Sequence, residues 1–79
     1  MGRKPRPKPA LLGAKLLAIR QNLGISQFEM AKRLNFPLYT RLSEFESGKR
    51  EPNLLLLLRY AKLAGITVEE LIDDAINWP

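Results

Sequence analysis

The sequence predicts an all-α domain, on three kinds of observation. Apolar residues recur at steps of three and four along successive segments, which is the spacing of one face of an α-helix. Two segments begin with a capping box, Ser26 with Glu29 and Thr67 with Glu70, whose side chains can satisfy the free backbone donors of a first helical turn. The segments are followed by glycines, which can take the left-handed conformation that closes a helix: Gly24, Gly48 and Gly65.

A basic, proline-rich arm is predicted for residues 1–9, ahead of a domain over residues 10–76 and a tail at 77–79. Pro5, Pro7 and Pro9 alternate with Lys and Arg, a pattern that favours an extended, solvated chain. Such an arm can follow DNA phosphates or enter a minor groove. A disordered tail that only aids solubility is the alternative. The cations of the arm are Arg3, Lys4, Arg6 and Lys8.

The first helix is expected over residues 10–23. Leu12, Leu16, Ile19 and Leu23 follow one another at steps of four, three and four, and so form one apolar stripe. We expect this stripe to face the core.

Two short helices are predicted between residues 26 and 48. Asn35, Phe36 and Pro37 end the first of them, because proline lacks a backbone donor and disfavours a helical predecessor. Leu42 and Phe45 supply the buried side of the second. Because helices joined so tightly cannot lie antiparallel, they should cross steeply, as in a helix-turn-helix unit. The outward side chains of the second helix can make directional hydrogen bonds: Tyr39, Thr40, Arg41, Ser43, Glu44 and Ser47.

A fourth helix is expected from Leu54 to Ala64 after the N-cap Asn53, and a fifth from Thr67 through Ile76. On the fourth helix the residues expected to share one side are Leu54, Leu57, Leu58 and Ala61. Some apolar residues exceed what a core of this size needs. They are either a dimer surface or padding of a thin core: Leu55, Leu56, Ile72, Ile76 and Trp78.

Composition restricts the function classes. Without Cys or His the chain lacks thiolate ligands, the usual zinc ligand and a nucleophile–base set, so we expect no metal, no cofactor and no enzyme. No apolar run approaches the roughly 20 residues that span a bilayer, so we expect no membrane partner and a cytoplasmic protein. Residues 1–50 carry a charge balance of +8 and residues 51–79 one of −3. A basic half that contains the two short helices is typical of nucleic-acid binders, with a merely solvated basic surface as the alternative.

The order and spacing of several motifs resemble the Cro/repressor helix-turn-helix family, called the Xre family in bacteria. The resemblance covers roughly residues 11–72. Its most specific parts are Gly24-x-Ser26-Gln27, Ala31 with Leu34, Glu46-x-Gly48-Lys49-x-x-Pro52, and Gly65-x-Thr67-x-x-x-Leu71. One departure is an extra residue near Phe36–Leu38, which alters the turn between the two short helices.

The resemblance implies a compact five-helix, lambda-repressor-like bundle whose third helix reads bases in the major groove. The residues assigned to base reading are Tyr39, Thr40, Arg41 and Glu44, and those assigned to phosphate are Gln27, Ser43, Ser47, Lys49 and Arg50. Arg20 and Glu46 would form a structural pair between the first and third helices. The carboxylate of Glu44 repels phosphate, so it either discriminates between sequences by rejection or has a structural partner within the protein, such as Arg41.

We therefore expect a sequence-specific, double-stranded DNA-binding regulator, a repressor, acting as a homodimer on a palindromic operator and associated with the nucleoid. The alternative is a protein-interaction module, an antitoxin or adaptor. In that case the leucine-rich fourth helix and the C-terminal helix would grip a toxin or co-regulator.

Overall fold

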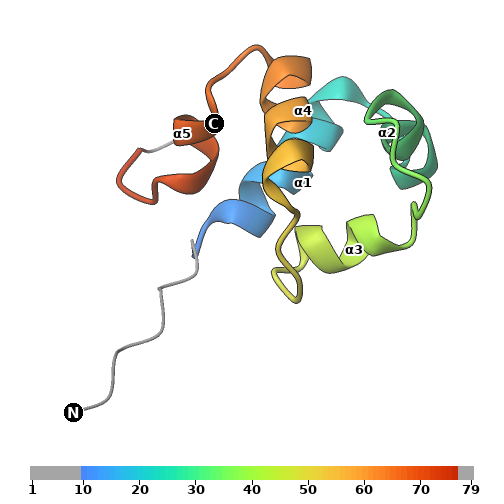
Figure 1. The fold of residues 1–79 in the computed structure, drawn as a ribbon, viewed down its shortest axis with the longest axis horizontal. Helices are drawn as coiled ribbons and strands as arrows, with labels where there is room; N and C mark the ends of the chain where they lie inside the picture. The colour runs from blue at the N-terminus through green and yellow to red at the C-terminus, as the bar shows by residue number, and fades with distance from the viewer. Residues whose placement is uncertain (1–9, 77–79) are drawn as a thin grey trace.

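The computed structural model describes residues 10–76, which form five α-helices and no strand (Figure 1). The helices are α1 (Leu12–Leu23), α2 (Gln27–Arg33), α3 (Arg41–Glu46), α4 (Leu54–Ala64) and α5 (Val68–Ile72). The all-α prediction and the order of its elements are confirmed. The basic arm and Trp78 lie outside the described residues.

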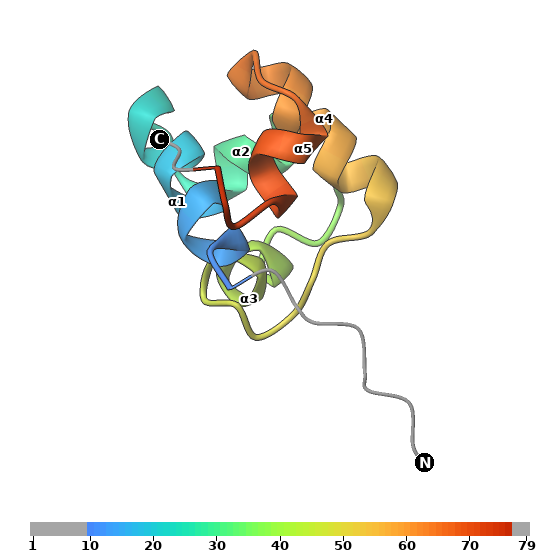
Figure 2. The same cartoon turned by 90° about the vertical axis from the view of Figure 1, so that its left-hand side faces the viewer.

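Helix α1 is the centre of the bundle and packs against α3, α4 and α5, while α2 packs against α3. In Figure 1, α2 and α3 lie at one side of the molecule and α5 at the opposite side, with α1 and α4 between them. Figure 2, turned by 90°, shows α5 in front and α2 behind it. The helix-turn-helix pair is therefore held by the bundle from one side only.

The predicted local signals form the helix ends. Ser26 accepts a hydrogen bond from the backbone N–H of Glu29, and Asn53 accepts one from that of Leu56. Thr67 and Glu70 make both bonds of a capping box. Gly24 and Gly65 close their helices in the left-handed conformation. Each of these ends depends on residues within a few positions of one another.

The buried face of α1 contains a lysine that the apolar stripe did not predict. Leu12, Leu16 and Ile19 are buried as expected, but Leu23 in the last turn is 37% exposed. Lys15 is only 1% exposed, and its ammonium donates to the backbone oxygens of Glu70, Asp73 and Ile76 at 2.7, 3.1 and 3.1 Å. Three donors meet three acceptors, so the buried charge is fully hydrogen-bonded.

Helix α4 turns a different face to the core from the one predicted. The buried residues are Leu56, Leu57, Tyr60 and Ala61, two pairs at a spacing of four, whereas Leu54 and Leu58 are exposed. The aromatic ring of Tyr60, fully buried, fixes this rotation. Leu56 therefore belongs to the core and is not part of an exposed dimer surface.

The hydroxyl of Tyr60 has no hydrogen-bond partner among the described residues. Burial raises the pKa of this phenol well above its ordinary value, so it stays neutral. Its ring fills space in the core. The buried hydroxyl without a hydrogen bond is unfavourable to the stability of the fold.

Helix α5 is shorter than predicted and ends at Ile72, so Ile76 lies beyond it. Asp73 is extended, and its carboxylate accepts from the backbone of Ala75, a local bond that competes with helix continuation. The next carboxylate, of Asp74, accepts from the backbone N–H groups of Ala10 and Leu11 at 2.8 and 3.0 Å. Asp74 thus caps the start of α1 from the far end of the domain.

Helix α1 lies very close to the end of α3 at Gly13. A Cβ atom built at Gly13 would lie 2.8 Å from the oxygen of Glu46, 2.9 Å from the nitrogen of Gly48 and 3.0 Å from the oxygen of Phe45. These are backbone atoms, which cannot move aside as a flexible side chain can. The close packing of α1 on the end of α3 therefore requires glycine at this position.

We predict that Gly13→Ala destabilises the fold by about 1–3 kcal/mol, as overpacking does, although alanine in place of helical glycine ordinarily stabilises by about 1 kcal/mol. Urea unfolding followed by circular dichroism measures the difference. Asn22→Ala, an exposed change on the same helix, is the control. A midpoint for Gly13→Ala equal to or above that of the wild type would contradict the packing argument.

A second prediction concerns pH. The hydrogen bonds from Ala10, then Leu11, lower the pKa of Asp74 below its ordinary value. A lowered pKa means that the contribution to stability is present above the unfolded-state pKa, about 3.9, and is lost as the pH falls through the lower native value. Asp74→Ala should lower the melting temperature at neutral pH, and the difference from wild type should shrink in acid. Glu69→Ala, an exposed acid without a described partner, should show no such convergence.

Candidate nucleic-acid interface

The outward face of α3 is presented as the sequence predicted. Leu42 and Phe45 are buried at 0% and 4% exposure and attach the helix to the core. Of the side chains assigned to base reading, Arg41 and Glu44 lie on α3 and are half-exposed. Tyr39 and Thr40, which were expected on this helix, precede its first residue and are exposed. Within the helix, the alternation of buried and outward positions follows helical geometry.

The turn before α3 is built around a left-handed asparagine. Asn35 has φ 54°, and the backbone N–H of Phe36 donates to Ala31 at 2.9 Å, which ends α2. Phe36 packs on Phe45 with 5.8 Å between ring centroids. The extra residue is thus absorbed by a turn whose first aromatic side chain faces the core.

An exposed aromatic pair connects the two short helices. Phe28 and Tyr39 meet edge to face, with ring centroids 5.3 Å apart, and the ammonium of Lys32 lies 5.8 Å from the Phe28 ring. Phe28 is 57% exposed and Tyr39 45%. This contact restrains the position of Tyr39, two residues before the start of α3.

The carboxylate of Glu46 joins three helices. Arg20 donates from Nε and Nη2 to its two oxygens at 2.7 and 3.1 Å, which is the structural pair expected from the resemblance. The hydrogen bond with Glu46 raises the pKa of Arg20, despite the opposing effect of burial. Arg20 also donates to the backbone oxygen of Ile25, at 2.9 Å. The side chain of Glu46 is only 5% exposed, so its charge is hidden from any ligand.

Gln27 belongs to the same network, which the sequence did not predict. Its amide nitrogen donates to Glu46 at 3.0 Å and so attaches the start of α2 to α3. An amide nitrogen has two hydrogens, and the second remains for a phosphate oxygen. The assignment of Gln27 to phosphate stays a prediction.

Ser43 in α3 and Ser47, the C-cap of this helix, both use their hydroxyl hydrogens for bonds to backbone oxygens. Ser43 donates to the backbone oxygen of Thr40 at 3.0 Å, and Ser47 to that of Glu44 at 3.1 Å. A hydroxyl has one hydrogen, so either serine must release its carbonyl before it donates to phosphate. Their predicted phosphate contacts are untested.

The partner of Glu44 is Arg50, not Arg41. Nε of Arg50 donates to Oε1 of Glu44 at 2.7 Å. This hydrogen bond lowers the pKa of Glu44, and the charges of Arg50, Arg41 and Lys49 lower it further. Lys49 itself is exposed and makes no side-chain hydrogen bond or ion pair with the described residues, and its assignment to phosphate stays a prediction.

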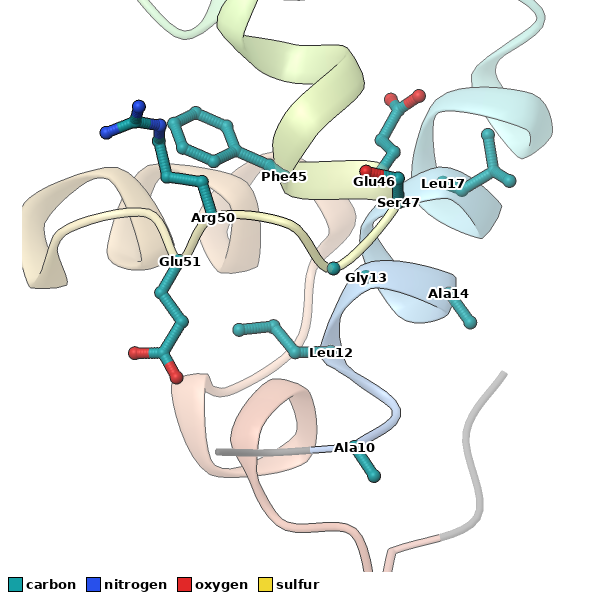
Figure 3. Close-up of a pocket in the computed structure, with 11 residues that line it drawn as sticks. Ala10, Leu12, Gly13, Ala14, Leu17, Phe45, Glu46, Ser47, Arg50 and Glu51 are labelled. Atoms are coloured by element: carbon teal, nitrogen blue, oxygen red, sulfur yellow. The ribbon is translucent and has the colours of Figure 1, made fainter. Parts of the chain in front are cut away.

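A groove of about 660 Å³ lies between the start of α1 and the loop after α3 (Figure 3). Leu12, Leu17 and Phe45 give it apolar walls, and the loop gives it a polar edge. In Figure 3, Arg50 and Glu51 point in opposite directions from this loop. Gly13, at the close contact between α1 and the end of α3, also lines the groove.

Residues 10–76 contain no group of three or more His, Cys, Asp and Glu side chains arranged to hold a metal ion. None of their helices has the length and apolar character required to cross a bilayer.

Comparison with known proteins agrees with this geometry. The family model described as "Helix-turn-helix" matches residues 16–71. Comparison with curated proteins gives no match. Among solved structures, the P22 c2 repressor in complex with synthetic operator 9T in the presence of Tl⁺ has a similar fold. It shares 25% sequence identity at a TM-score of 0.72, over 80% of this chain and 94% of that one. The chain belongs to the Xre family of helix-turn-helix proteins.

Proposed function

We propose that this protein is a sequence-specific DNA-binding transcriptional repressor. The observation that carries the proposal is the outward face of α3, whose polar side chains stand beside the cations Arg41, Lys49 and Arg50. A helix of this width fits the major groove of B-DNA, and the polar side chains can then meet base edges. The similar P22 c2 repressor was solved with a synthetic operator, which supports the same role here.

Affinity and specificity are divided between different residues in this proposal. Lys49, Arg50 and Gln27 neutralise or bond phosphate, and make binding steeply salt-dependent. Tyr39, Thr40, Arg41 and Glu44 meet base edges and set the preferred sequence. Because the proposed ligand is DNA, we propose that the protein acts in the cytoplasm, at the nucleoid.

We further propose that the repressor binds as a homodimer to a palindrome with half-sites about one helical turn apart. Of the residues predicted for a dimer surface, Leu55 and Ile72 are exposed, at 55% and 41%. Leu54 and Leu58 on α4 are exposed as well and enlarge the apolar surface that a second copy could cover. The alternative, an antitoxin or adaptor, has no specific observation in its favour, since the same leucines serve self-association.

The proposal is tested by selecting bound sequences from a random pool of double-stranded DNA. We expect enrichment of one inverted repeat, because a two-fold dimer presents two copies of α3. Gel shifts on the enriched sequence then measure affinity. If folded protein enriches no sequence at low salt, the repressor assignment is wrong.

We predict that Lys49→Ala weakens binding to every DNA sequence by a similar factor and reduces the slope of log K against log salt by about one unit for each bound protomer, and so by about two units for the proposed homodimer. The reason is the loss of one phosphate contact in each protomer. Lys62→Ala, an exposed lysine at the end of α4, is the matched control and should leave the slope unchanged. An unaltered slope for Lys49→Ala would remove this residue from the phosphate contacts.

A further inference from the structure

The contact between Glu44 and Arg50 links a base-facing position to a phosphate-facing one. The backbone prepares it: the N–H groups of Lys49 and Arg50 both donate to the backbone oxygen of Glu44, at 2.9 and 3.2 Å. The loop is thereby folded back onto α3. The backbone of Arg50 is thereby held in a fixed position relative to the carboxylate of Glu44.

The side-chain bond uses only part of each group. Nε of Arg50 donates to Oε1 of Glu44, while Oε2 and the two terminal guanidinium nitrogens make no hydrogen bond with the described residues. The side chains are 34% exposed for Glu44 and 50% exposed for Arg50. One carboxylate oxygen and several N–H groups are therefore available to a ligand while the pair stays intact.

The chemistry of these free atoms is complementary to DNA. A carboxylate oxygen only accepts, so on a base edge in the major groove it requires an amine, such as N4 of cytosine. The terminal nitrogens of an arginine donate to phosphate oxygens in a planar fork. Without Arg50, the carboxylate would lose the cation that is hydrogen-bonded to it, and with it the bond that fixes its rotamer.

We propose that Arg50 is a positioning residue that bridges a DNA phosphate and Glu44, and so orients the carboxylate toward one base amine. This inference rests on the proposed function, because it specifies how the proposed reading face discriminates. Arg50 then determines sequence preference as well as affinity. A residue that only neutralised phosphate would affect affinity alone.

Two substitutions separate these roles. Arg50→Gln places an amide nitrogen at the same position along the side chain as Nε, so the donor to Glu44 remains and the positive charge is lost. Arg50→Lys keeps the charge but places a carbon at that position and its ammonium one atom further along, so the donor is lost from the Nε position. Lys49→Ala, on the neighbouring exposed lysine, is the control for charge removal without loss of the pair.

The experiment uses the sequence enriched from the random pool and its single base-pair substitutions. Dissociation constants are measured for the wild type, both Arg50 variants, Glu44→Ala and the combination of Glu44→Ala with Arg50→Lys. Each protein is measured at several salt concentrations. Circular dichroism melting verifies that each variant is folded.

When Glu44→Ala is the only substitution, the ratio of dissociation constants between the substituted and the selected base pair should fall by roughly tenfold at one position. Arg50→Lys should lose a similar factor at the same base pair while the salt slope is kept, and it should have no further effect on the Glu44→Ala background. Arg50→Gln should keep the discrimination and lower the slope by about one unit for each bound protomer.

The inference is overturned if Arg50→Lys keeps wild-type discrimination, if its loss falls on another base pair, or if Glu44→Ala changes no base preference. These outcomes leave the proposed function in place, because the wild type still selects a sequence. If the wild type selects none, the proposed function and the inference fail together.

Discussion

The bond network around Glu46 is the constraint on which the presentation of α3 depends. Burying a carboxylate to 5% exposure costs free energy unless its oxygens accept hydrogen bonds. Here the oxygens accept hydrogen bonds from Arg20 of α1 and Gln27 of α2. Removing either partner would leave a buried charge with fewer bonds, which is a larger cost than the loss of a surface pair. The three helices therefore share one arrangement.

Helix α3 has six residues and could not persist as an isolated helix, since helices this short are unstable in water. Its order comes from contacts with other segments. Glu46 holds it to the bundle, and Gly13 lets α1 approach its last turn. Glu44, two residues from Glu46, points outward and is held by Arg50 instead. Two carboxylates on one short helix thus have separate tasks because different arginines reach them.

The features that the sequence predicted correctly are local ones. The N-caps at Ser26, Asn53 and Thr67 and the glycine ends depend on neighbours within one turn, so their residues can be read from the sequence. The burial of Leu42 and Phe45 follows from helical spacing. The Arg20–Glu46 pair, distant in sequence, was found only through the family resemblance.

The features that sequence analysis missed depend on partners far along the chain. Lys15 occupies the apolar stripe of α1, three residues after Leu12 and four before Ile19, but its acceptors are some 55 to 61 residues away. Gly13 matters only because α3 packs there. On α4 the five consecutive leucines did not indicate which face of the helix is buried. The observed rotation of α4 buries the ring of Tyr60, a residue that was not expected on the buried face. The partner of Glu44 lay beyond the helix, in a loop whose path the sequence did not specify.

The burial of Lys15 has a consequence for how this domain opens. Its amine is covered as long as α5 stays docked, because the carbonyls that enclose it belong to the end of that helix and the turn after it. An amine-reactive reagent can reach it only after those carbonyls have moved away, whereas the exposed Lys62 is accessible at all times. The ratio of the labelling rates of Lys15 and Lys62 therefore measures how often α5 detaches. It does not report local unfolding of α2 and α3.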